Sequence, residues 1–301
     1  MSTRDPEEAT AVGNPEIGEI AAATRMGPVS LTVADLDRSL AYYQSQIGLE
    51  TLEREDGRAS LGTGESELLE LVEVPGAVPA DRMTGLFHFA LLVPTRPDLA
   101  AWLAHAARDR VGLTGLSDHY VSEAIYLRDP DHHGIEIYAD RPREIWDGLV
   151  GIRMTTEPLD TDNLLGELED PATAPFDGLP AGTVMGHVHL RVAAIPGTID
   201  FYRDRIGFGL TAALGGQAAF LSAGGYHHHL GANTWESAGA AAPPEGSAAL
   251  RHFTVYVPDA RERDRVADRA AEGGATVERI GDEAWLSDPS GNRLRLVPDP
   301  A

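Results

Sequence analysis

Three consecutive histidines stand in the stretch GGYHHHLGANTW, which runs from Gly224 to Trp235, in a chain that has only 11 histidines. An imidazole changes its charge near neutral pH, and it is also the side chain that most often binds metal ions. The chain contains no cysteine, so any metal ion has to bind histidine, aspartate or glutamate. The run predicts either a site for metal or proton chemistry, or an exposed and solvated loop.

Other candidate side chains lie in segments with the alternation of β-strands. In GIEIYAD, Glu136 and Tyr138 share one face of the expected strand, and in HVHL, His187 and His189 share one face. A glutamate on so apolar a strand indicates a functional role if its face is internal, and one of the two histidines then binds metal while the other lines the cavity. The alternative is a set of hydrogen-bonded histidines on a half-buried sheet.

The composition limits the classes of protein and of partner. A chain of 301 residues, 43% of them hydrophobic, is long enough for two domains with real cores, and it has no apolar run of transmembrane length. The net charge of −23 repels phosphate backbones and anionic lipids, so we expect neither a nucleic-acid nor a membrane partner. The N-terminus lacks the basic start and apolar core of a signal peptide, so the expected location is the cytoplasm.

The elements that position these residues repeat along the chain. The stretch GPVSLTVADLDRSLAYYQSQIGLE, from Gly27, matches GHVHLRVAAIPGTIDFYRDRIGFG, from Gly186, as a strand, a turn and a helix. Gly48 and Gly207 stand where a helix ends on a residue with positive φ. Later segments match in the same way, and an Asp-Pro turn joins two alternating strands in each half. Four modules of strand, helix and three strands are predicted, at about 26–75, 84–140, 184–235 and 249–299.

The predicted class is therefore α+β, with two modules in each half of the chain. We expect a flexible tail over 1–25, an N-terminal domain over 26–140, a connector over 141–183 and a C-terminal domain over 184–299. The connector contains one short candidate helix, from Asn163 to Leu168. Small residues and prolines from Ser237 to Ala249 predict a plain linker between the third and fourth modules.

The four modules resemble the vicinal oxygen chelate superfamily, which includes glyoxalases, bleomycin-resistance proteins and extradiol dioxygenases. The chain is most similar to its bacterial catechol 2,3-dioxygenase-like group, in GLFHFALLVP, SDHYVSEAIYLRDPDHHGIEIYADRPRE, MGHVHLRV and GGYHHHLGANTW. The resemblance implies paired modules whose curled, mixed sheets enclose a cavity with a divalent metal ion. A fold of this kind does not by itself fix the reaction.

The resemblance implies a metal site at the opening and closing strands of the modules. The opening strands place Pro28, His88, His187 and His252 at equivalent points, and the closing strands place Glu136 opposite Arg295. Two imidazoles and one carboxylate on one face suit Fe(II), which keeps its other positions open for a diol and dioxygen. We therefore expect His88, His187 and Glu136 to bind Fe(II), with Mn(II) as the other candidate.

The resemblance also implies three catalytic side chains. His119 is expected to assist deprotonation and Tyr126 to help hold the substrate, and Asp118 would raise the basicity of His119 through a hydrogen bond. His229 is expected to stabilise oxygen and to relay a proton, although a displacement by one residue would give this role to His228. His105, His132 and His133 are expected to be structural or solvated.

The way in which the modules pair decides where these residues meet. If the second module pairs with the third, His88, Glu136, His187 and His229 share one cavity, which is the arrangement that we favour. If neighbours pair within each half, His252 becomes an alternative ligand and Glu136 lies apart from His187. The favoured pairing leaves Pro28, Glu70, His252 and Arg295 in a degenerate partner.

The sequence thus predicts an Fe(II)-dependent extradiol ring-cleaving dioxygenase that acts on a small aromatic diol and dioxygen. A glyoxalase-like isomerase or lyase and a non-catalytic binding or resistance protein are the alternatives. The ring substituents and the metal's identity stay open, and so does the oligomeric state, for which a homo-oligomer is compatible with the sequence.

Overall fold

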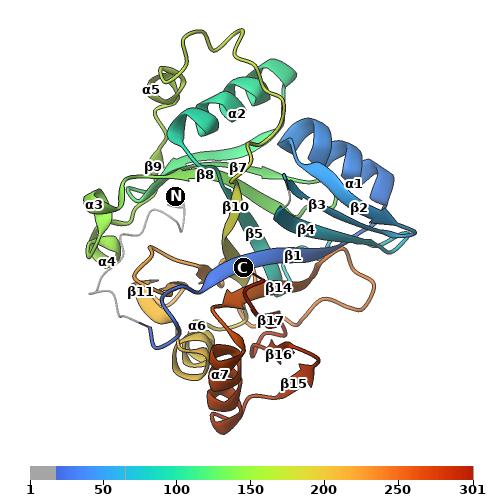
Figure 1. Cartoon of the computed structure of the whole chain (residues 1–301), viewed down its shortest axis with the longest axis vertical. Coiled ribbons are helices and arrows are strands. Elements are labelled where there is room, and N and C mark those ends of the chain that lie inside the picture. The colour runs from blue at the N-terminus through green and yellow to red at the C-terminus, as the bar shows by residue number, and fades with distance from the viewer. Residues whose placement is uncertain (1–17, 65, 301) are drawn as a thin grey trace.

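The computed structural model describes residues 18–64 and 66–300 (Figure 1). As predicted, it contains four modules, each with a strand, a helical segment and three further strands. The first comprises β1 (Arg25–Val33), α1 (Leu36–Tyr42), the π-helical turn η2 (Tyr43–Ile47), β2 (Glu50–Glu55), β3 (Arg58–Thr63) and β4 (Ser66–Glu73). The second comprises β5 (Gly85–Leu92), α2 (Arg96–Asp109), β6 (Leu113–Asp118), β7 (Ser122–Arg128) and β8 (Gly134–Asp140).

The second half of the chain repeats this order. The third module comprises β10 (Val184–Arg191), α6 (Ile195–Ile199), η3 (Asp200–Ile206), β11 (Gly209–Leu214), β12 (Ala218–Ser222) and β13 (Leu230–Asn233). The fourth comprises β14 (Leu250–Val257), α7 (Ala260–Glu272), β15 (Val277–Ile280), β16 (Glu283–Ser287) and β17 (Arg293–Pro298). Between the halves lie α3 (Arg143–Trp146), α4 (Val150–Arg153), β9 (Glu157–Pro158) and α5 (Thr161–Leu165).

The modules form two mixed sheets, which confirms the predicted α+β class. The sheet with the order β11-β12-β13-β10-β5-β8-β7-β6-β9 joins the second and third modules, and that with the order β15-β16-β17-β14-β1-β4-β3-β2 joins the first and fourth. The favoured pairing of the modules is thus the observed one. Each sheet takes one module from each half of the chain, and the domain ranges 26–140 and 184–299 stay predictions about units of sequence.

Alternation along the central strands gives each sheet an apolar face that packs beneath helices. In the eight-stranded sheet this face includes Leu31, Val255 and Leu294, all fully buried, and in the nine-stranded sheet it includes Phe89, Ile135 and Val188. Helix α2 packs on β8, and α7 packs on β14, β16 and β17 (Figure 1). The opposite face of the nine-stranded sheet is left for polar side chains.

Matching tyrosines join each helical turn to the module that follows it. The turns end at Gly48 and Gly207, whose φ angles of 89° and 99° confirm the predicted helix ends. Inside the first turn, the Tyr43 hydroxyl donates to Oδ2 of Asp129 over 2.8 Å, and inside the second, Tyr202 donates to Oδ2 of Asp288 over 3.2 Å. Each aspartate begins an Asp-Pro turn of the other sheet, so these bonds hold the two sheets together.

The chain before β1 and the connector contribute to the body of the protein. The predicted tail over 1–25 falls mostly outside the described residues, but Ile20 is buried and the Ala21 amide donates to Oε1 of Glu262 over 2.8 Å. Helix α5 spans Thr161–Leu165, so it begins two residues before the candidate helix at Asn163 and ends sooner. Within the described residues, no helix has the length and apolar character needed to cross a bilayer.

Candidate metal centre

Three donor atoms converge on the face of the nine-stranded sheet. Ala90 on β5 pairs with His187 on β10 and with Glu136 on β8, and His88 precedes Ala90 by two residues, so its side chain points to the same face. Oε2 of Glu136 lies 3.0 Å from Nε2 of His187 and 3.0 Å from Nε2 of His88. The small side chain of Ala90 leaves the space in which these groups meet.

The donor set fits a divalent metal ion. The donor atoms of the three residues all lie within 4.8 Å of one another, and all three side chains are buried. Nε2 of His88 makes no hydrogen bond with any described residue, although it lies close to the carboxylate. A buried imidazole nitrogen without a partner is costly unless something else binds it. Two imidazoles and a carboxylate suit Fe(II), Mn(II) and Zn(II).

The protonation states agree with this assignment. Burial raises the pKa of Glu136, but the neighbouring His187 and His88 outweigh burial and bring this pKa well below its ordinary value. Burial lowers the pKa of His187, and the Glu136 carboxylate opposes that shift only in part. An ionised carboxylate beside neutral imidazoles is the state that binds a metal ion.

Aromatic rings hold His187 in place. Its ring packs between Tyr138, at a centroid distance of 4.9 Å, and His228, at 4.2 Å. The Tyr138 hydroxyl reaches the backbone at Gly186, where a Cβ would lie only 1.9 Å from its oxygen. Only glycine fits at this position, because any side chain would collide with the Tyr138 hydroxyl. Tyr138 shares a strand face with Glu136, as predicted.

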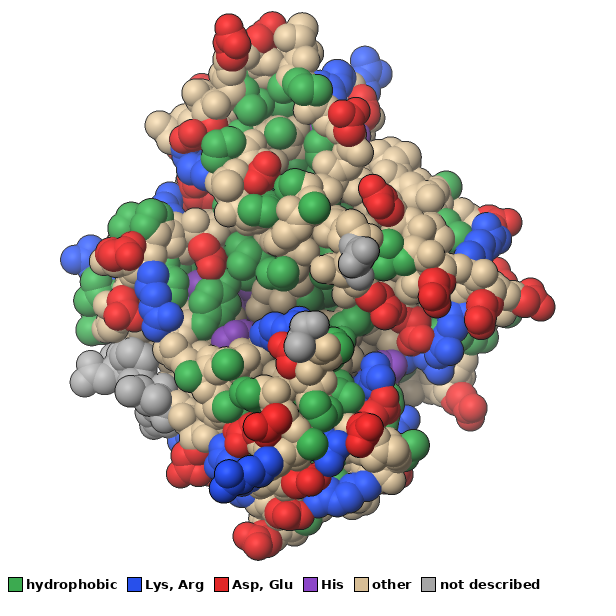
Figure 2. All heavy atoms as spheres, in the orientation of Figure 1, with side chains coloured by type: hydrophobic (Ala, Val, Ile, Leu, Met, Phe, Trp, Pro, Cys, Tyr) green, Lys and Arg blue, Asp and Glu red, His purple; other side chains and the backbone are tan. Residues whose placement is uncertain are grey.

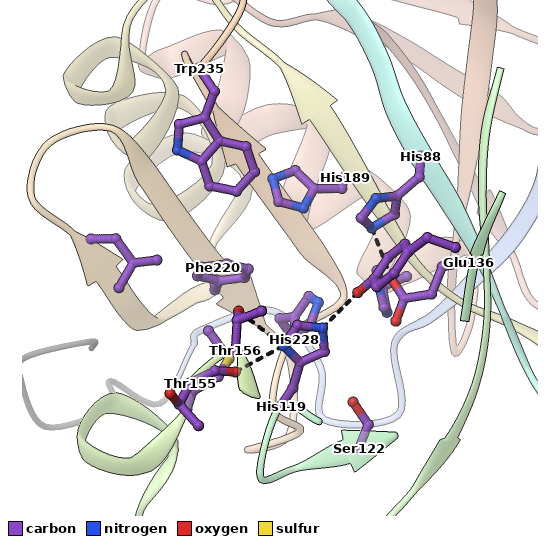
Figure 3. Close-up of a pocket in the computed structure, with 14 residues that line it drawn as sticks. His88, His119, Ser122, Glu136, Thr155, Thr156, His189, Phe220, His228 and Trp235 are labelled. Carbon is purple, nitrogen blue, oxygen red and sulfur yellow. Dashed lines mark hydrogen bonds and ion pairs between the residues drawn. The ribbon is translucent and has the colours of Figure 1, made fainter. Parts of the chain in front are cut away.

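His119 and Tyr126 form a hydrogen-bonded pair beside the three ligands (Figure 3). Nε2 of His119 lies 2.6 Å from the Tyr126 hydroxyl, and Nδ1 lies 2.9 Å from the carbonyl oxygen of Thr155 in the connector. A carbonyl can only accept, so Nδ1 carries the proton and Nε2 of the neutral ring accepts from Tyr126. Burial lowers the pKa of His119, with partial opposition from Glu136.

The expected bond between Asp118 and His119 is not formed. The Asp118 carboxylate binds Arg141 instead, with Nη2 donating to Oδ2 over 2.7 Å, and its Oδ1 accepts from the Tyr120 amide. Tyr120 has a φ of 68°, so the chain turns sharply after His119 and directs the imidazole away from Asp118. The Thr155 carbonyl, and not the Asp118 carboxylate, is thus the partner of Nδ1 of His119.

The cavity is polar at the ligands and apolar at the opposite wall. His88, His187 and Glu136 line it together with His119, Ser122 and Tyr126 on the polar side. Leu214, Phe220 and Trp235 line the other side, and Met154, Thr155 and Thr156 of the connector complete the wall (Figure 3). Figure 2 shows charged side chains spread over the outside of the protein and histidines only in small recessed patches on this face. The cavity suits a flat apolar ring with a polar edge.

The histidine run is not the strand that alternation predicts. Gly224 and Gly225 turn the chain with φ angles of 59° and 68°, and β13 begins only at Leu230. As a result His228 lines the cavity, whereas His229 is buried elsewhere and its Nδ1 accepts from the Ala223 amide over 3.1 Å. The structure thus brings His228, and not His229, to the candidate site, which is the one-residue displacement that the sequence left open.

Comparisons with known proteins agree with these features. A model of the Glyoxalase/Bleomycin resistance protein/Dioxygenase superfamily matches residues 25–137 and 184–296. The chain belongs to this superfamily. A catechol-2,3-dioxygenase of Bacillus subtilis (strain 168) is 40% identical over 281 residues, which are 91% of this chain and 97% of that protein. The resemblance predicted from the sequence is thereby confirmed.

Solved structures of the superfamily share the fold. A putative dioxygenase from Bacillus subtilis subsp. subtilis str. 168 superposes with a TM-score of 0.63 at 14% identity, over 92% of this chain and 86% of that one. Glyoxalase I from Zea mays superposes with a TM-score of 0.56 at 20% identity, over 92% of each chain. Both therefore support the superfamily fold and leave the reaction open.

His189 was expected to line the cavity, and it does so in this member of the superfamily. Its Nε2 lies 3.0 Å from the Asn233 amide nitrogen, and the Asn233 side-chain oxygen accepts from the Trp235 amide, which fixes how that side chain is oriented. A Cβ at Gly231 would lie 2.8 Å from the His189 ring. Gly231 occupies in the third module the position that Glu136 occupies in the second. The His189 ring therefore fills the space that the side chain of a fourth metal ligand would take at that position.

Three further histidines, which were expected to be structural or solvated, do not line the candidate site of this superfamily member. His105 lies 3.2 Å from the carbonyl oxygen of Gln46, His133 lies 2.9 Å from that of Thr32, and the exposed His132 pairs with Asp81. Sequence reasoning missed Thr155 and Trp235. Apolar residue types before β12 and after β13 could have indicated an apolar wall of the cavity. No residue type could have indicated that a backbone carbonyl of the connector binds His119.

Proposed function

We propose that the protein is a metal-dependent extradiol dioxygenase that opens the ring of a catechol-type diol beside its hydroxyl groups. One observation carries this proposal: the buried cluster of His88, Glu136 and His187 shares its cavity with the hydrogen-bonded pair of His119 and Tyr126. A metal ion and a positioned acid–base group are both needed to deprotonate a diol and to oxidise it. The name of the Bacillus subtilis relative supports the same reaction.

His88, Glu136 and His187 would hold Fe(II), with Mn(II) as the alternative. Three protein donors leave coordination positions open, and Fe(II) bound in this way would provide places for both diol oxygens and a path by which electrons of the diol reach dioxygen. The chain offers no thiolate that would favour a softer metal.

His119 and Tyr126 would remove and hold a proton of the diol. Nε2 of His119 carries no proton in the tautomer set by Thr155, so it can accept one from a substrate hydroxyl through the Tyr126 hydroxyl. His228 also lines the cavity, and we give it the proton-relay role that was expected of His229. Ring opening then needs the held proton to return to the product.

The apolar wall indicates which ring substituents fit. With the diol oxygens at the ligands, the far edge of the ring faces Leu214, Phe220 and Trp235. None of the described residues that line the cavity is a lysine or an arginine. A carboxylate on the ring would be buried there without a cation, which is unfavourable, so unsubstituted and alkyl-substituted catechols are the proposed substrates.

The test is oxygen uptake by anaerobically purified, Fe(II)-loaded protein with catechol, 4-methylcatechol and 3,4-dihydroxybenzoate. The expected products of the first two carry both atoms of ¹⁸O₂ in a ring-opened chain, and the carboxylated diol reacts much more slowly. Absence of any ring opening would remove the dioxygenase assignment. Comparable rates with all three diols would remove only the inference about substituents.

The competing assignment is a glyoxalase-like isomerase, because two histidines and a glutamate also suit Zn(II). Oxygen-independent turnover of a small-molecule substrate, together with a preference for Zn(II) or Ni(II) over Fe(II), would establish that assignment. A protein that binds small molecules but turns over none with any of these metals would be a binding module.

A further inference from the structure

Two of the three consecutive histidines form a chain of hydrogen bonds that leads from the cavity to the end of β8. Nδ1 of His228 lies 2.8 Å from Nδ1 of His227, and Nε2 of His227 lies 2.9 Å from Oδ1 of Asp140. Asp140 follows Glu136 by four residues and is a quarter exposed, whereas the His227 side chain is wholly buried. The chain thus connects a cavity histidine with a carboxylate at the surface.

The direction of these bonds follows from what each group can donate. The Asp140 carboxylate only accepts, so Nε2 of His227 carries a proton and donates it. Nδ1 of the neutral His227 ring is then a lone pair, and it must accept from a proton on Nδ1 of His228. Nε2 of His228 is left without a proton, and it makes no hydrogen bond with any described residue.

We propose that Asp140 and His227 are positioning residues that hold His228 in the tautomer with its proton on Nδ1, so that Nε2 faces the cavity as a proton acceptor. The inference about catalysis rests on the proposed function, but the tautomer does not. The proposal also gives each of the three consecutive histidines a different role, because Nδ1 of His229 accepts from the Ala223 amide.

The surroundings keep the chain of bonds rigid. The His227 ring packs against Tyr226 at a centroid distance of 3.9 Å and against Trp146 at 5.4 Å. Its carbonyl accepts from the Thr211 hydroxyl over 2.8 Å. The His228 ring packs against the His187 ring at a centroid distance of 4.2 Å and a tilt of 47°, so the positions of the two rings are coupled. A rotation that exchanges the two nitrogens of His227 would break its bonds to His228 and Asp140.

The opposite arrangement needs a doubly protonated His227, which would donate to both Asp140 and His228. The centroid of the His227 ring lies 6.4 Å from the centroid of the His187 ring. A second positive charge so close to a bound divalent ion, in a buried site, is electrostatically unfavourable. This arrangement would leave the proton of His228 on Nε2, so the two possibilities differ in an observable way.

The direct test is the ¹⁵N spectrum of histidine-labelled full-length protein loaded with Zn(II), which is diamagnetic. Two-bond ¹H–¹⁵N correlations are assigned to His228 by comparison with the variant His228→Gln. The expected result is a protonated Nδ1 and an unprotonated Nε2 for His228, and loss of this preference in His227→Phe. A protonated Nε2 in the unmodified protein would overturn the proposal. Because this readout needs no turnover, it stands even if catechols do not react.

Kinetics of the Fe(II) enzyme give the second readout. Asp140→Asn and His227→Phe are expected to lower kcat by about 10- to 100-fold, as outer-shell changes do, with metal content and KM near normal. Asp147→Asn is the matched control, since Asp147 is an exposed aspartate of the connector that pairs with Arg143. Unchanged kcat in both test variants, with a normal His228 tautomer, would show that the two residues do not position it.

Discussion

The two sheets place four side chains in the same register, yet among the described residues only one sheet brings together a group that could hold a metal ion. In the nine-stranded sheet, Ala90 lies between His187 and Glu136, and His88 precedes it by two residues. In the eight-stranded sheet, Ser30 lies in the same way between His252 and Glu70, and Pro28 precedes it by two residues. The backbone therefore provides two equivalent positions for a metal site, and the side chains present decide which of the two could bind an ion.

The side chains of the eight-stranded sheet bind one another. The Glu70 carboxylate accepts from the Ser30 hydroxyl and pairs with Arg58, at 2.8 Å from Nη2 to Oε1. Arg295, which is the counterpart of Gly231, pairs with Glu283 beside it. His252 packs its ring against Trp285 at a centroid distance of 4.8 Å. A carboxylate occupied by an arginine, with a second guanidinium nearby, has little affinity for a cation.

The largest effect is expected from the two equivalent glutamates. Glu136→Ala removes the only carboxylate of the candidate cluster, so metal affinity should fall by more than the roughly 10- to 100-fold loss that outer-shell changes cause. Glu70→Ala should leave metal content unchanged. Metal analysis after equilibrium dialysis against Fe(II) compares the two variants, and His187→Ala should behave like Glu136→Ala. Retention of metal by Glu136→Ala would mean that the ion binds elsewhere.

The next effect concerns turnover without loss of metal. His119→Phe and Tyr126→Phe remove the proposed proton acceptor and its partner, so kcat should fall by about 10²- to 10⁴-fold. His252→Ala, in the other sheet, should keep its metal and most of its activity. Oxygen uptake and iron content are measured on the same samples. If His119→Phe reacts like the unmodified protein, the proton-transfer role is wrong.

A gain of function would sharpen the comparison further. Pro28 lies at a β-bulge of β1, between the paired residues Met26 and Val29, so replacing it does not disturb a regular ladder of backbone hydrogen bonds. The triple variant of Pro28→His, Arg58→Ala and Arg295→Gly would offer two imidazoles and Glu70, without the guanidinium that pairs with Glu70 and without the second one nearby. We expect a second, weak Co(II) or Zn(II) site, detected as binding of more than one ion per chain by calorimetry. Pro28→His alone should bind one ion, because Arg58 and Arg295 both remain.

Sequence reasoning reached the strands and the pairing of the modules but not the details of the site walls. Alternation along β5, β8 and β10 is local, so the sequence shows which residues share a strand face, and the resemblance to the superfamily then implied that His88, Glu136 and His187 bind the metal ion. The chain bends at Gly224 and Gly225, so strand alternation does not hold in the histidine run and could not show whether His228 or His229 faces the cavity. The contact between His119 and the Thr155 carbonyl is long-range and depends on backbone alone, so no residue type signalled it.

The smallest effect tests whether His252 is a structural residue. Burial lowers its pKa to about 4, with partial opposition from Glu70. The unfolded chain takes up a proton at this residue near pH 6.5, before the folded protein does, so the free energy of unfolding falls as the pH decreases from about 6.5 to about 4. His252→Gln cannot take up that proton. In metal-free protein, its Tm should fall by about 5 °C less over this range than that of the unmodified protein. Calorimetry of both proteins at matched pH values measures the difference, with His132→Gln as the exposed control. Equal slopes for all three would mean that His252 titrates as freely in the folded sheet as in the unfolded chain.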